Sequence, residues 1–420
     1  MSKRLFVTLS LLAIAGLVLV ACVPPRPPFE PPTDPIGVVK IPPGEPIHIA
    51  YWLVVAGPDA SLGEDSKRGI EIAIDDMGGK LLGRPIKLTG EDSGCNAEGG
   101  IAAATKLSTD PTIVGLIGSS CSSEAAAGVP ILSKAGYVTI SPSNTRPHFT
   151  MPEQRKPGGP LHVDFAGYLR TAHSDAVQGA VAAQFAWEVL KAKKAATIHD
   201  GSPYAEALQQ VFADKFKEFG GTITSQEAVS PTDVDMRAVL TKIAADKPDV
   251  IYYPIFIAAG AHITKQAREI PDLDDTALMG ADGMFSPDFV AGAGPAAEGV
   301  YLSSPDFTAF AAGYEDFRKK HKEKYGEDVL SIFHAHAYDA AMILFKAIEK
   351  VAVTAPDGTI YIGRQALRDA LFATKDHQGL TGVLSCDPYG DCSAPLIAIY
   401  QITAREVGGQ WPPEKPVWKP

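Results

Sequence analysis

Beyond its first 21 residues, this sequence of 420 residues lacks any apolar run of the roughly 20 residues that a transmembrane helix needs. It also lacks an excess of basic residues, because 38 Lys and Arg stand against 49 Asp and Glu, for a net charge of −11. That acidity argues against binding to nucleic acid or to anionic lipid. A hydrophobic content of 45% and a length too great for one core predict a globular protein of two domains.

The common phosphate-binding and nucleophile motifs are also missing. No GxGxxG follows an expected strand, no GxxxxGK[ST] occurs, and the serine-rich turn at residues 118–123 (GSSCSS) is not GxSxG. His334 and His336 lie two residues apart on an expected helix, so their side chains point apart and a shared metal ion is not expected. These absences favour a binding protein without a metal or other cofactor. A secreted hydrolase that uses a serine of this turn is the enzymatic alternative.

Cysteine is scarce, and none of the five cysteines belongs to a CxxC pair. Cys386 and Cys392 flank a turn (DPYGD) and are expected to form a local disulfide. Cys95 and Cys121, each just after an expected strand, then pair by elimination. A zinc site made of these four cysteines is the alternative, which their spacing disfavours.

The N-terminal residues have the pattern of a secretory signal. Lys3 and Arg4 precede an apolar segment, and the LVAC sequence that ends at Cys22 looks like the lipobox of bacterial lipoproteins. That likeness implies a signal peptide over residues 1–21, a lipid on the Cys22 sulfur, and an extracytoplasmic protein held at the cell membrane or in the periplasm. A plain signal peptide with an incidental cysteine is the alternative. Residues 22–46 are rich in proline and are expected to be an extended tether.

The apolar run at residues 113–117 leads through the serine-rich turn into a helix that is expected to begin at Glu124. Strand, tight turn and helix form half of a βαβ unit, and ligands collect where such strands end. Ser122 or Ser123 is a suitable N-cap, and the free N–H groups and hydroxyls there suit a carboxylate or a phosphate. Alternatively, these serines only cap the helix.

Strands and helices alternate at βαβ spacing along two stretches of similar size, residues 47–145 and 177–279. This alternation predicts an α/β fold with parallel sheets that are covered on both faces. Residues 146–168 are expected to form an insertion loop, residues 380–402 a hairpin around the second disulfide, and residues 411–420 a loose tail.

Nine short motifs follow one another in a recognisable order. They are AGP at 56–58 with Gly63, EDSGC at 91–95, GSSCSS at 118–123, SPSNT at 141–145, RTAHSD at 170–175, IHDGSPY at 198–204, YY at 252–253, MGADG at 279–283 and TGVLS at 381–385. Together they resemble the leucine/isoleucine/valine-binding protein class of type I periplasmic binding proteins, the substrate-capture subunits of amino-acid ABC importers. The likeness runs from residue 47 to residue 402.

The resemblance implies two Rossmann-like lobes joined by three crossings, near residues 171–175, 302–305 and 374–378. Lobe 1 is then expected over residues 47–173 and 304–376, and lobe 2 over residues 174–303 and 377–410. The family's first-lobe disulfide falls on Cys95 and Cys121, in agreement with the pairing by elimination. The resemblance further implies an amino-acid ligand, branched-chain or aliphatic, permease subunits as partners, and no cofactor.

Residue by residue, the resemblance implies a ligand site between the lobes. Ser122 matches the hydroxyl that receives the ligand's α-carboxylate. Thr145, with Ser143 and Asn144 beside it, matches the turn that takes the carboxylate from the other side and helps to bind the ammonium. In lobe 2, Tyr204 matches an aromatic residue that closes over the ligand, and Asp282 matches an acidic residue that pairs with the ammonium. The remaining expected ligand contacts are Leu62, Asp175, Phe256 and Phe333.

Electrostatics supports these roles, because both charges of a zwitterion must be met when it enters a desolvated cleft. Groups on opposite lobes meet both charges only when the lobes close.

Departures from the family pattern leave the identity of the ligand undetermined. Leu62 replaces an aromatic residue, Asp282 is one methylene shorter than the usual glutamate, and Ser143 and Asn144 replace small apolar residues. An amide or a small acid is therefore an alternative ligand, and sensing by a lipoprotein of the same fold is an alternative role. Asp282 as a plain turn residue and Tyr204 as a surface aromatic are the structural alternatives.

Overall fold

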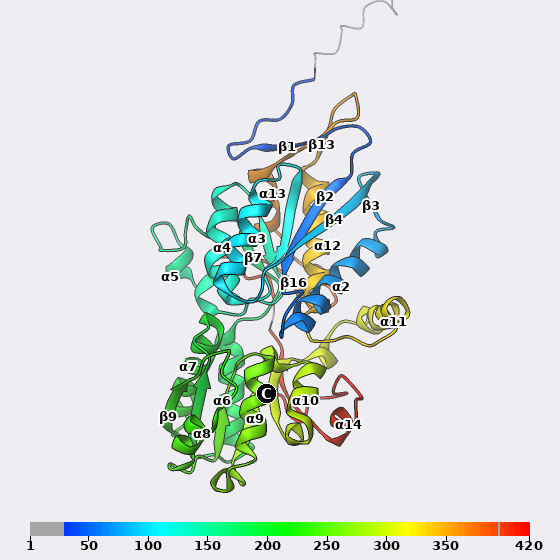
Figure 1. The fold of residues 1–420 in the computed structure, drawn as a ribbon. Coiled ribbons are helices and arrows are strands. Elements are labelled where there is room, and N and C mark those ends of the chain that lie inside the picture. The colour runs from blue at the N-terminus through cyan, green and yellow to red at the C-terminus, as the bar shows by residue number, and fades with distance from the viewer. Residues whose placement is uncertain (1–28, 394) are drawn as a thin grey trace, which may run out of the picture.

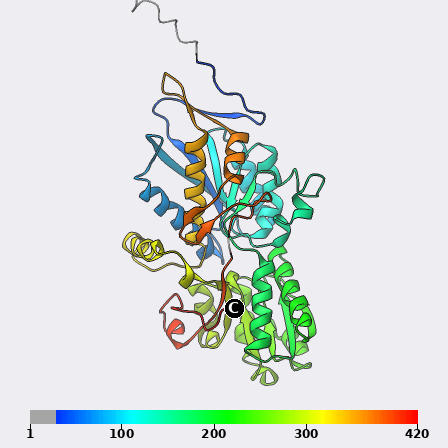
Figure 2. The same ribbon diagram turned by 180° about the vertical axis from the view of Figure 1, so that it is seen from behind.

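The computed structural model describes residues 29–393 and 395–420. Figures 1 and 2 show two lobes stacked end to end and joined at the middle of the molecule. The expected signal peptide, the expected lipidation site Cys22 and the first part of the expected tether lie outside the described residues. Within the part of the chain that the structure describes, no helix is long and apolar enough to cross a membrane.

Lobe 1 is built around a six-stranded sheet in the order β3-β4-β2-β5-β6-β7. All neighbouring strands run parallel except β3 and β4. On β2, Ile49 and Leu53 belong to one buried cluster and Ala50 and Trp52 to another, as expected for a strand buried on both faces. The strands are β2 (Ile47–Leu53), β3 (Lys80–Leu81), β4 (Arg84–Asp92), β5 (Ile113–Gly118), β6 (Thr139–Ser141) and β7 (Tyr168–Arg170).

Helices cover both faces of this sheet (Figure 1). One face carries α2 (Ala60–Asp76), α12 (His334–Val351) and α13 (Arg364–Phe372), whose apolar residues join the cluster that contains Ile49. The other face carries α3 (Ala97–Ser108) and α4 (Ser122–Lys134), which join the cluster that contains Trp52. Two further helices are α5 (Pro152–Arg155), in the expected insertion loop, and α11 (Gly313–Tyr325), beside α2.

Lobe 2 repeats this architecture with a sheet in the order β17-β12-β11-β10-β8-β9. Only the β12–β17 pair is antiparallel. The parallel order in both lobes confirms the predicted α/β fold. The strands are β8 (Lys194–His199), β9 (Thr222–Ala228), β10 (Val250–Tyr252), β11 (Ala277–Gly280), β12 (Tyr301–Pro305) and β17 (Ile397–Gln401). The helices are α6 (Asp175–Glu188), α7 (Pro203–Glu218), α8 (Arg237–Ala244), α9 (Ile257–Ala267), α10 (Pro287–Ala293) and α14 (Ala404–Val407).

Three chain segments connect the lobes. The first follows β7 and the second follows β12, near the expected positions, but the third lies immediately before β17 and not near residues 374–378. The segment with β15 (His377–Gly379), β16 (Gly382–Leu384) and the second disulfide stays with lobe 1, because Leu384, Cys386 and Cys392 are buried in its core. The expected hairpin over residues 380–402 does not form, since β17 pairs with β12 of lobe 2.

The three connecting segments lie side by side. The backbone N–H of Asp306, just after β12, donates to the carbonyl of Leu396 at 2.8 Å. The Ser393 hydroxyl donates to the carbonyl of Ala172, just after β7, at 2.9 Å. These bonds tie each crossing to another, so the three form one hinge region.

The second half of the expected tether is folded onto lobe 1. There, β1 (Val38–Ile41) pairs antiparallel with β14 (Ile360–Gly363), which also pairs with β13 (Val353–Thr354). Val39 and Ile41 are buried, and Asp34 accepts hydrogen bonds from the backbone N–H of Gln365 in α13. The tether prediction is wrong for this part, because alternate apolar side chains in the VVKI segment outweigh the flanking prolines.

Both predicted disulfides are present, Cys95–Cys121 and Cys386–Cys392, and they rule out a zinc site made of the four thiols. The expected loose tail is also wrong. Trp418 forms a β-bridge with Ile399, and the Trp411 ring packs against Phe285 with ring centroids 5.0 Å apart. The apolar area of the two tryptophans holds the tail against lobe 2 despite its prolines.

Candidate functional site

A cavity between the lobes brings together most of the residues that were expected to contact a ligand. Its volume is about 340 Å³, including its opening to solvent. It is lined by Leu62, Ser120, Cys121, Ser122, Ser143 and Phe333 from lobe 1 and by Tyr204, Phe256, Asp282 and Gly283 from lobe 2. The expected contacts Asn144, Thr145 and Asp175 do not line it and are buried next to it.

The N-terminus of α4 faces this cavity from lobe 1. The helix begins at Ser122, two residues before the expected Glu124, and its N-cap is Cys121 rather than a serine. The Glu124 side chain accepts a hydrogen bond from the Cys121 backbone N–H at 2.8 Å, so this carboxyl group serves the helix start. The Ser122 hydroxyl is only 2% exposed and has no hydrogen-bond partner among the described residues. Ser122 is therefore not the cap of this helix, and the interpretation in which it only caps the helix is wrong.

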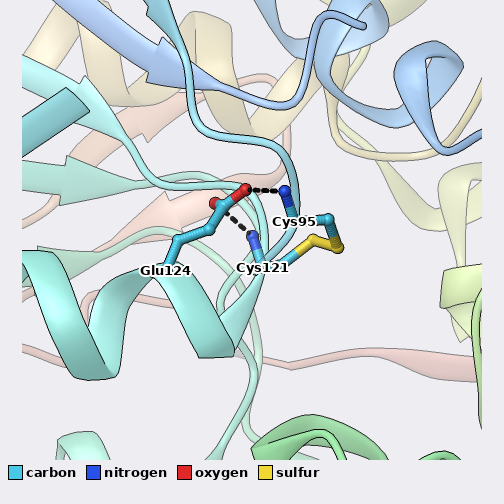
Figure 3. A group of neighbouring side chains, drawn as sticks. All are labelled: Cys95, Cys121 and Glu124. Atoms are coloured by element: carbon cyan, nitrogen blue, oxygen red, sulfur yellow. Dashed lines mark hydrogen bonds between the residues drawn. A yellow bond between two sulfur atoms is a disulfide. The ribbon is translucent and has the colours of Figure 1, made fainter. Parts of the chain in front are cut away.

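Glu124 anchors this turn to the first disulfide (Figure 3). Its Oε1 accepts from the Cys95 backbone N–H at 2.7 Å and from the Ser93 hydroxyl at 2.7 Å. Burial raises the pKa of Glu124 to about 7, and the hydrogen bonds from Cys121, Ser93 and Cys95 oppose that rise only in part. The disulfide and the buried carboxyl group together fix where α4 starts.

The turn after β6 supports the serine turn from the side. Ser143 donates its hydroxyl to the Ser120 carbonyl at 2.9 Å, and the Asn144 amide donates to the same carbonyl at 2.9 Å. Asn144 is fully buried, so it holds the backbone of the site rather than facing a ligand. Thr145 is 1% exposed, and its side chain lies beside the buried carboxyl group of Asp175.

Lobe 2 contributes a carboxylate to the cavity. Asp282 follows β11, and its Oδ1 accepts from the Tyr204 hydroxyl at 2.9 Å and from the Gln178 amide nitrogen at 2.6 Å. The Tyr204 hydroxyl in turn accepts from the Gly283 backbone N–H at 3.2 Å. Tyr204 and Asp282 are both buried, which excludes a surface tyrosine, while Asp282 also begins the short 3-10 turn over Asp282–Met284.

A second carboxyl group lies behind the first. Asp175 is the first residue of α6 and is fully buried, and the Thr145 side chain is a hydrogen-bonding neighbour of its carboxyl group. Its backbone N–H donates to the Thr145 carbonyl at 2.9 Å. Burial, together with the nearby carboxylate of Asp282, raises the pKa of Asp175 well above its ordinary range. Two acidic groups therefore share a region with no Lys, Arg or His among the residues that line the cavity.

Three side chains make the apolar wall. Leu62 comes from α2, Phe256 is the N-cap of α9, and Phe333 is the N-cap of α12. The Phe256 ring packs against Tyr204 with ring centroids 5.2 Å apart. This wall suits an aliphatic group better than a charged one.

Sequence reasoning missed two kinds of residue here. Gln178, which holds Asp282, lies three residues after Asp175 on the same face of α6, so helical spacing could have identified it. The second kind consists of residues that contact each other across the cleft, and no spacing in the sequence identifies them. The Ile257 backbone N–H donates to Asp59 at 3.2 Å, and Ser61 and Ser286 share a hydrogen bond at 2.8 Å between their hydroxyl oxygens.

The two histidines of the HAH sequence do not form a metal site. His334 bonds to Asp65 through Nδ1 at 2.9 Å and to the Tyr314 hydroxyl through Nε2 at 2.8 Å. Both ring nitrogens are therefore engaged in the core of lobe 1, which confirms the expected structural role.

The chain was compared with known proteins. The model of the periplasmic binding protein family matches residues 46–388. The Leu/Ile/Val-binding protein BraC3 of Rhizobium johnstonii is 27% identical over 371 residues, which cover 86% of this chain and 93% of that protein. The leucine-, isoleucine-, valine-, threonine- and alanine-binding protein of Pseudomonas aeruginosa is 26% identical over 366 residues, which cover 84% and 89%.

Solved structures of other proteins have a similar fold. The branched-chain amino acid transporter substrate-binding protein LivJ from Streptococcus pneumoniae, in complex with isoleucine, superposes with a TM-score of 0.75 at 25% identity. The match covers 90% of this chain and all of that one. A solute-binding protein from R. palustris in complex with benzoate has a TM-score of 0.73 at 21% identity, over 89% of this chain and 97% of that one, and shows a shared fold alone.

Proposed function

The chain belongs to the periplasmic binding protein family, and we propose that it captures an aliphatic amino acid between its lobes and delivers it to the permease of an ABC importer. The observation that carries this proposal is the pairing of a hydrogen-bond donor site with a carboxylate across one cavity. Ser122 stands at a helix N-terminus in lobe 1, and Asp282 stands in lobe 2. The family consists of substrate-binding proteins that work outside the cytoplasm, so no catalytic group is needed at this site.

The lobe 1 side suits the ligand's carboxylate. A helix N-terminus offers unpaired N–H groups and the positive end of the helix dipole. The hydroxyl of Ser122 is buried and lacks a partner among the described residues, and a buried hydroxyl without a partner costs about 1–3 kcal/mol. A carboxylate that accepts from these groups removes that cost.

The lobe 2 side suits the ligand's ammonium. Asp282 and Asp175 place two buried carboxyl groups in a region whose lining has no basic side chain. Burial of an uncompensated charge is costly, and an ammonium beside Asp282 provides the missing counter-charge. The aspartate is shorter than the usual family glutamate, but Gln178 and Tyr204 hold its carboxylate facing the cavity.

Closure of the lobes follows because each lobe binds one charged group of the ligand. A ligand bound to lobe 1 alone has its carboxylate satisfied and its ammonium in water, whereas the closed form satisfies both. The ligand therefore binds the closed form more tightly, and that difference shifts the protein toward closure. The contacts of Asp59 with α9 and of Ser61 with Ser286 form between the lobes in the same state.

The apolar wall supports an aliphatic side chain. Leu62, Phe256 and Phe333 bury a hydrocarbon group without offering it a hydrogen bond. BraC3 is described as a Leu/Ile/Val-binding protein, and LivJ was solved in complex with isoleucine, which fits this wall. We extend the proposal to a lipid anchor on Cys22, followed by a short linker up to the folded segment that begins near Asp34. Mass analysis of the mature N-terminus tests this anchor, since an unmodified Cys22 would exclude it.

A thermal-shift screen against the twenty amino acids and small carboxylic acids tests the ligand class. A ligand at about 100 times its Kd adds about 2.7 kcal/mol to the free energy of unfolding, which raises Tm by a few degrees. We expect the branched-chain amino acids to give the largest shifts. Shifts from benzoate-like acids alone would contradict the proposal, because those acids have no group for Asp282.

A further inference from the structure

A second cavity of similar size lies where the three connecting segments meet. We call it the hinge cavity; His173, Pro305, His336 and Ser393 are among its lining residues. His173 belongs to the first crossing, Pro305 ends the strand before the second, and Ser393 belongs to the third. Including its opening to solvent, the hinge cavity has a volume of about 290 Å³. Of this, about 20 Å³ can hold the centre of a water molecule, which is enough for one water. It is separate from the ligand cavity described above.

Two imidazole rings face the hinge cavity with an unused nitrogen each. His173 is 2% exposed and His336 is 4% exposed. In the described part of the chain, the Nδ1 atoms of both rings have no hydrogen-bond partner. Burial lowers the pKa of His173, and it lowers the pKa of His336 to about 3, so both rings are neutral at physiological pH. Each neutral ring has one nitrogen that must accept a hydrogen bond and one that must donate.

The neighbours of Gln178 determine which nitrogen of His173 is protonated. The Gln178 amide nitrogen contacts Asp282 Oδ1 at 2.6 Å and the Ser303 carbonyl at 3.0 Å. A carboxylate and a carbonyl can only accept, so the amide cannot be flipped, and its oxygen must face His173. The Gln178 oxygen bonds to Nε2 of His173, so Nε2 carries the proton. Nδ1 of His173 is then a buried acceptor that needs a donor.

We propose that the hinge cavity binds one water molecule between His173 and His336, and that this water, His173 and Gln178 form a hydrogen-bonded relay that positions Asp282. The water donates to Nδ1 of His173, and Nε2–H of His173 donates to the Gln178 oxygen. The Gln178 amide then donates to the carboxylate that faces the ligand cavity. No covalent step and no net proton transfer occur, because each group keeps its own proton.

This relay connects the ligand site to the hinge. His173 lies on the first crossing, while Asp282 lies at the end of β11 in lobe 2. The His173 ring also stacks on Phe333 of the apolar wall, with ring centroids 6.3 Å apart. A rearrangement of the crossings therefore shifts the positions of both the Asp282 carboxylate and the Phe333 ring. His173 and Gln178 are thus positioning residues for ligand capture. This functional part rests on the proposed amino-acid site.

Histidine NMR on the purified protein tests the relay without any ligand. With ¹⁵N-labelled histidine, and with His173 assigned from a His173→Asn variant, we expect His173 to be the neutral Nε2–H tautomer with a hydrogen-bonded Nδ1. Gln178→Met should abolish the strong preference for that tautomer. Gln209→Met is the matched control, because Gln209 is also a buried glutamine of lobe 2 and bonds to Thr197 instead. An Nδ1–H tautomer in the unaltered protein would overturn the relay.

A crystal structure and calorimetry complete the test. Electron density for a water between the two Nδ1 atoms is expected, and a dry hinge cavity would contradict the proposal. If an amino acid binds, Gln178→Met should weaken it about tenfold or more while changing the affinity of its deaminated acid less than twofold, since the relay acts on the ammonium partner. An equal loss for both ligands would assign Gln178 a merely structural role. Failure of all amino acids to bind would refute the proposed function, while the tautomer result would still stand or fall by itself.

Discussion

Replacement of Glu124 by glutamine should change how the stability of this protein depends on pH. Glu124 is fully buried beneath the start of α4 and accepts hydrogen bonds from Ser93, Cys95 and Cys121 (Figure 3). Burial raises its pKa from about 4.5 to about 7. Between these two pH values the folded protein holds a proton that the unfolded chain has released. The raised pKa therefore stabilises the folded protein to its full extent below pH 4.5, and this stabilisation is lost as the pH rises through 7.

The pKa difference fixes the size of the effect. A difference from about 4.5 to about 7 corresponds to about 3 kcal/mol. Glutamine stays neutral at every pH, so Glu124→Gln should remove this pH dependence. The variant also places an amide nitrogen near one of the backbone donors, which costs about 1–3 kcal/mol at all pH values. The two contributions can be separated, because only the first changes with pH.

Urea unfolding of both proteins at intervals from pH 4.5 to pH 8 measures the difference directly. The stability of the unaltered protein minus that of the variant should fall by about 3 kcal/mol across this range. Glu98→Gln is the control, because Glu98 is an exposed carboxylate in the first turn of α3 and should show no such trend. If the free energies of unfolding of the unaltered protein and of Glu124→Gln change with pH in the same way, the reasoning is refuted.

Three further predictions concern the cleft and the first disulfide. Asp282→Asn should weaken amino-acid binding by tenfold or more in calorimetry, because the ammonium loses its charged partner, whereas the exposed control Asp288→Asn should not. Burial between the lobes raises the pKa of Asp59 from 3.8 to about 6, so closure takes up a proton. Ligand affinity should therefore fall about thirtyfold as the pH rises from 4 to 6. That slope should vanish in Asp59→Asn, and its persistence there would exclude Asp59 as its source. Replacing Cys95 and Cys121, which are 26 residues apart, by alanine should cost about 3 kcal/mol in urea unfolding, and an unchanged midpoint would contradict that cost.

The strand, turn and helix around residues 113–134 were predictable because their signals are local. An apolar run, a glycine and a cluster of hydroxyls indicate the turn, and Ser122, which was singled out there, lines the cavity. The exact N-cap was not predicted, since cysteine is an unusual N-cap residue. Glu124, three residues after Cys121, was a usable signal, because a carboxylate at that position reaches back to the cap.

The errors arose where composition hid a packing pattern. Prolines drew attention away from Val39 and Ile41, whose alternate spacing puts both into the core of lobe 1. They likewise concealed Trp411 and Trp418, which hold the C-terminal residues on lobe 2. The third crossing was misplaced because the partner of β17 is β12, almost one hundred residues earlier, and no local signal specifies that pairing.

The details of the site depend on contacts between residues that are distant in the sequence. The expected contact Asn144 turned out to support the serine turn, since its amide reaches backbone carbonyls rather than the cavity. The hydrogen bonds of Asp282 with Tyr204 and Gln178 join α6, α7 and the end of β11. Sequence motifs could identify Tyr204 and Asp282 separately, but only the three-dimensional structure brings them together.

The most direct test of the two-ended site is a calorimetric comparison of three matched ligands: isoleucine, its deaminated acid and its decarboxylated amine. Binding at Ser122 and Asp282 requires both charged groups, so isoleucine should bind at least a hundredfold more tightly than either analogue. If the acid or the amine binds as tightly as isoleucine, one end of the cavity contributes nothing, and capture of a zwitterion between the lobes is contradicted.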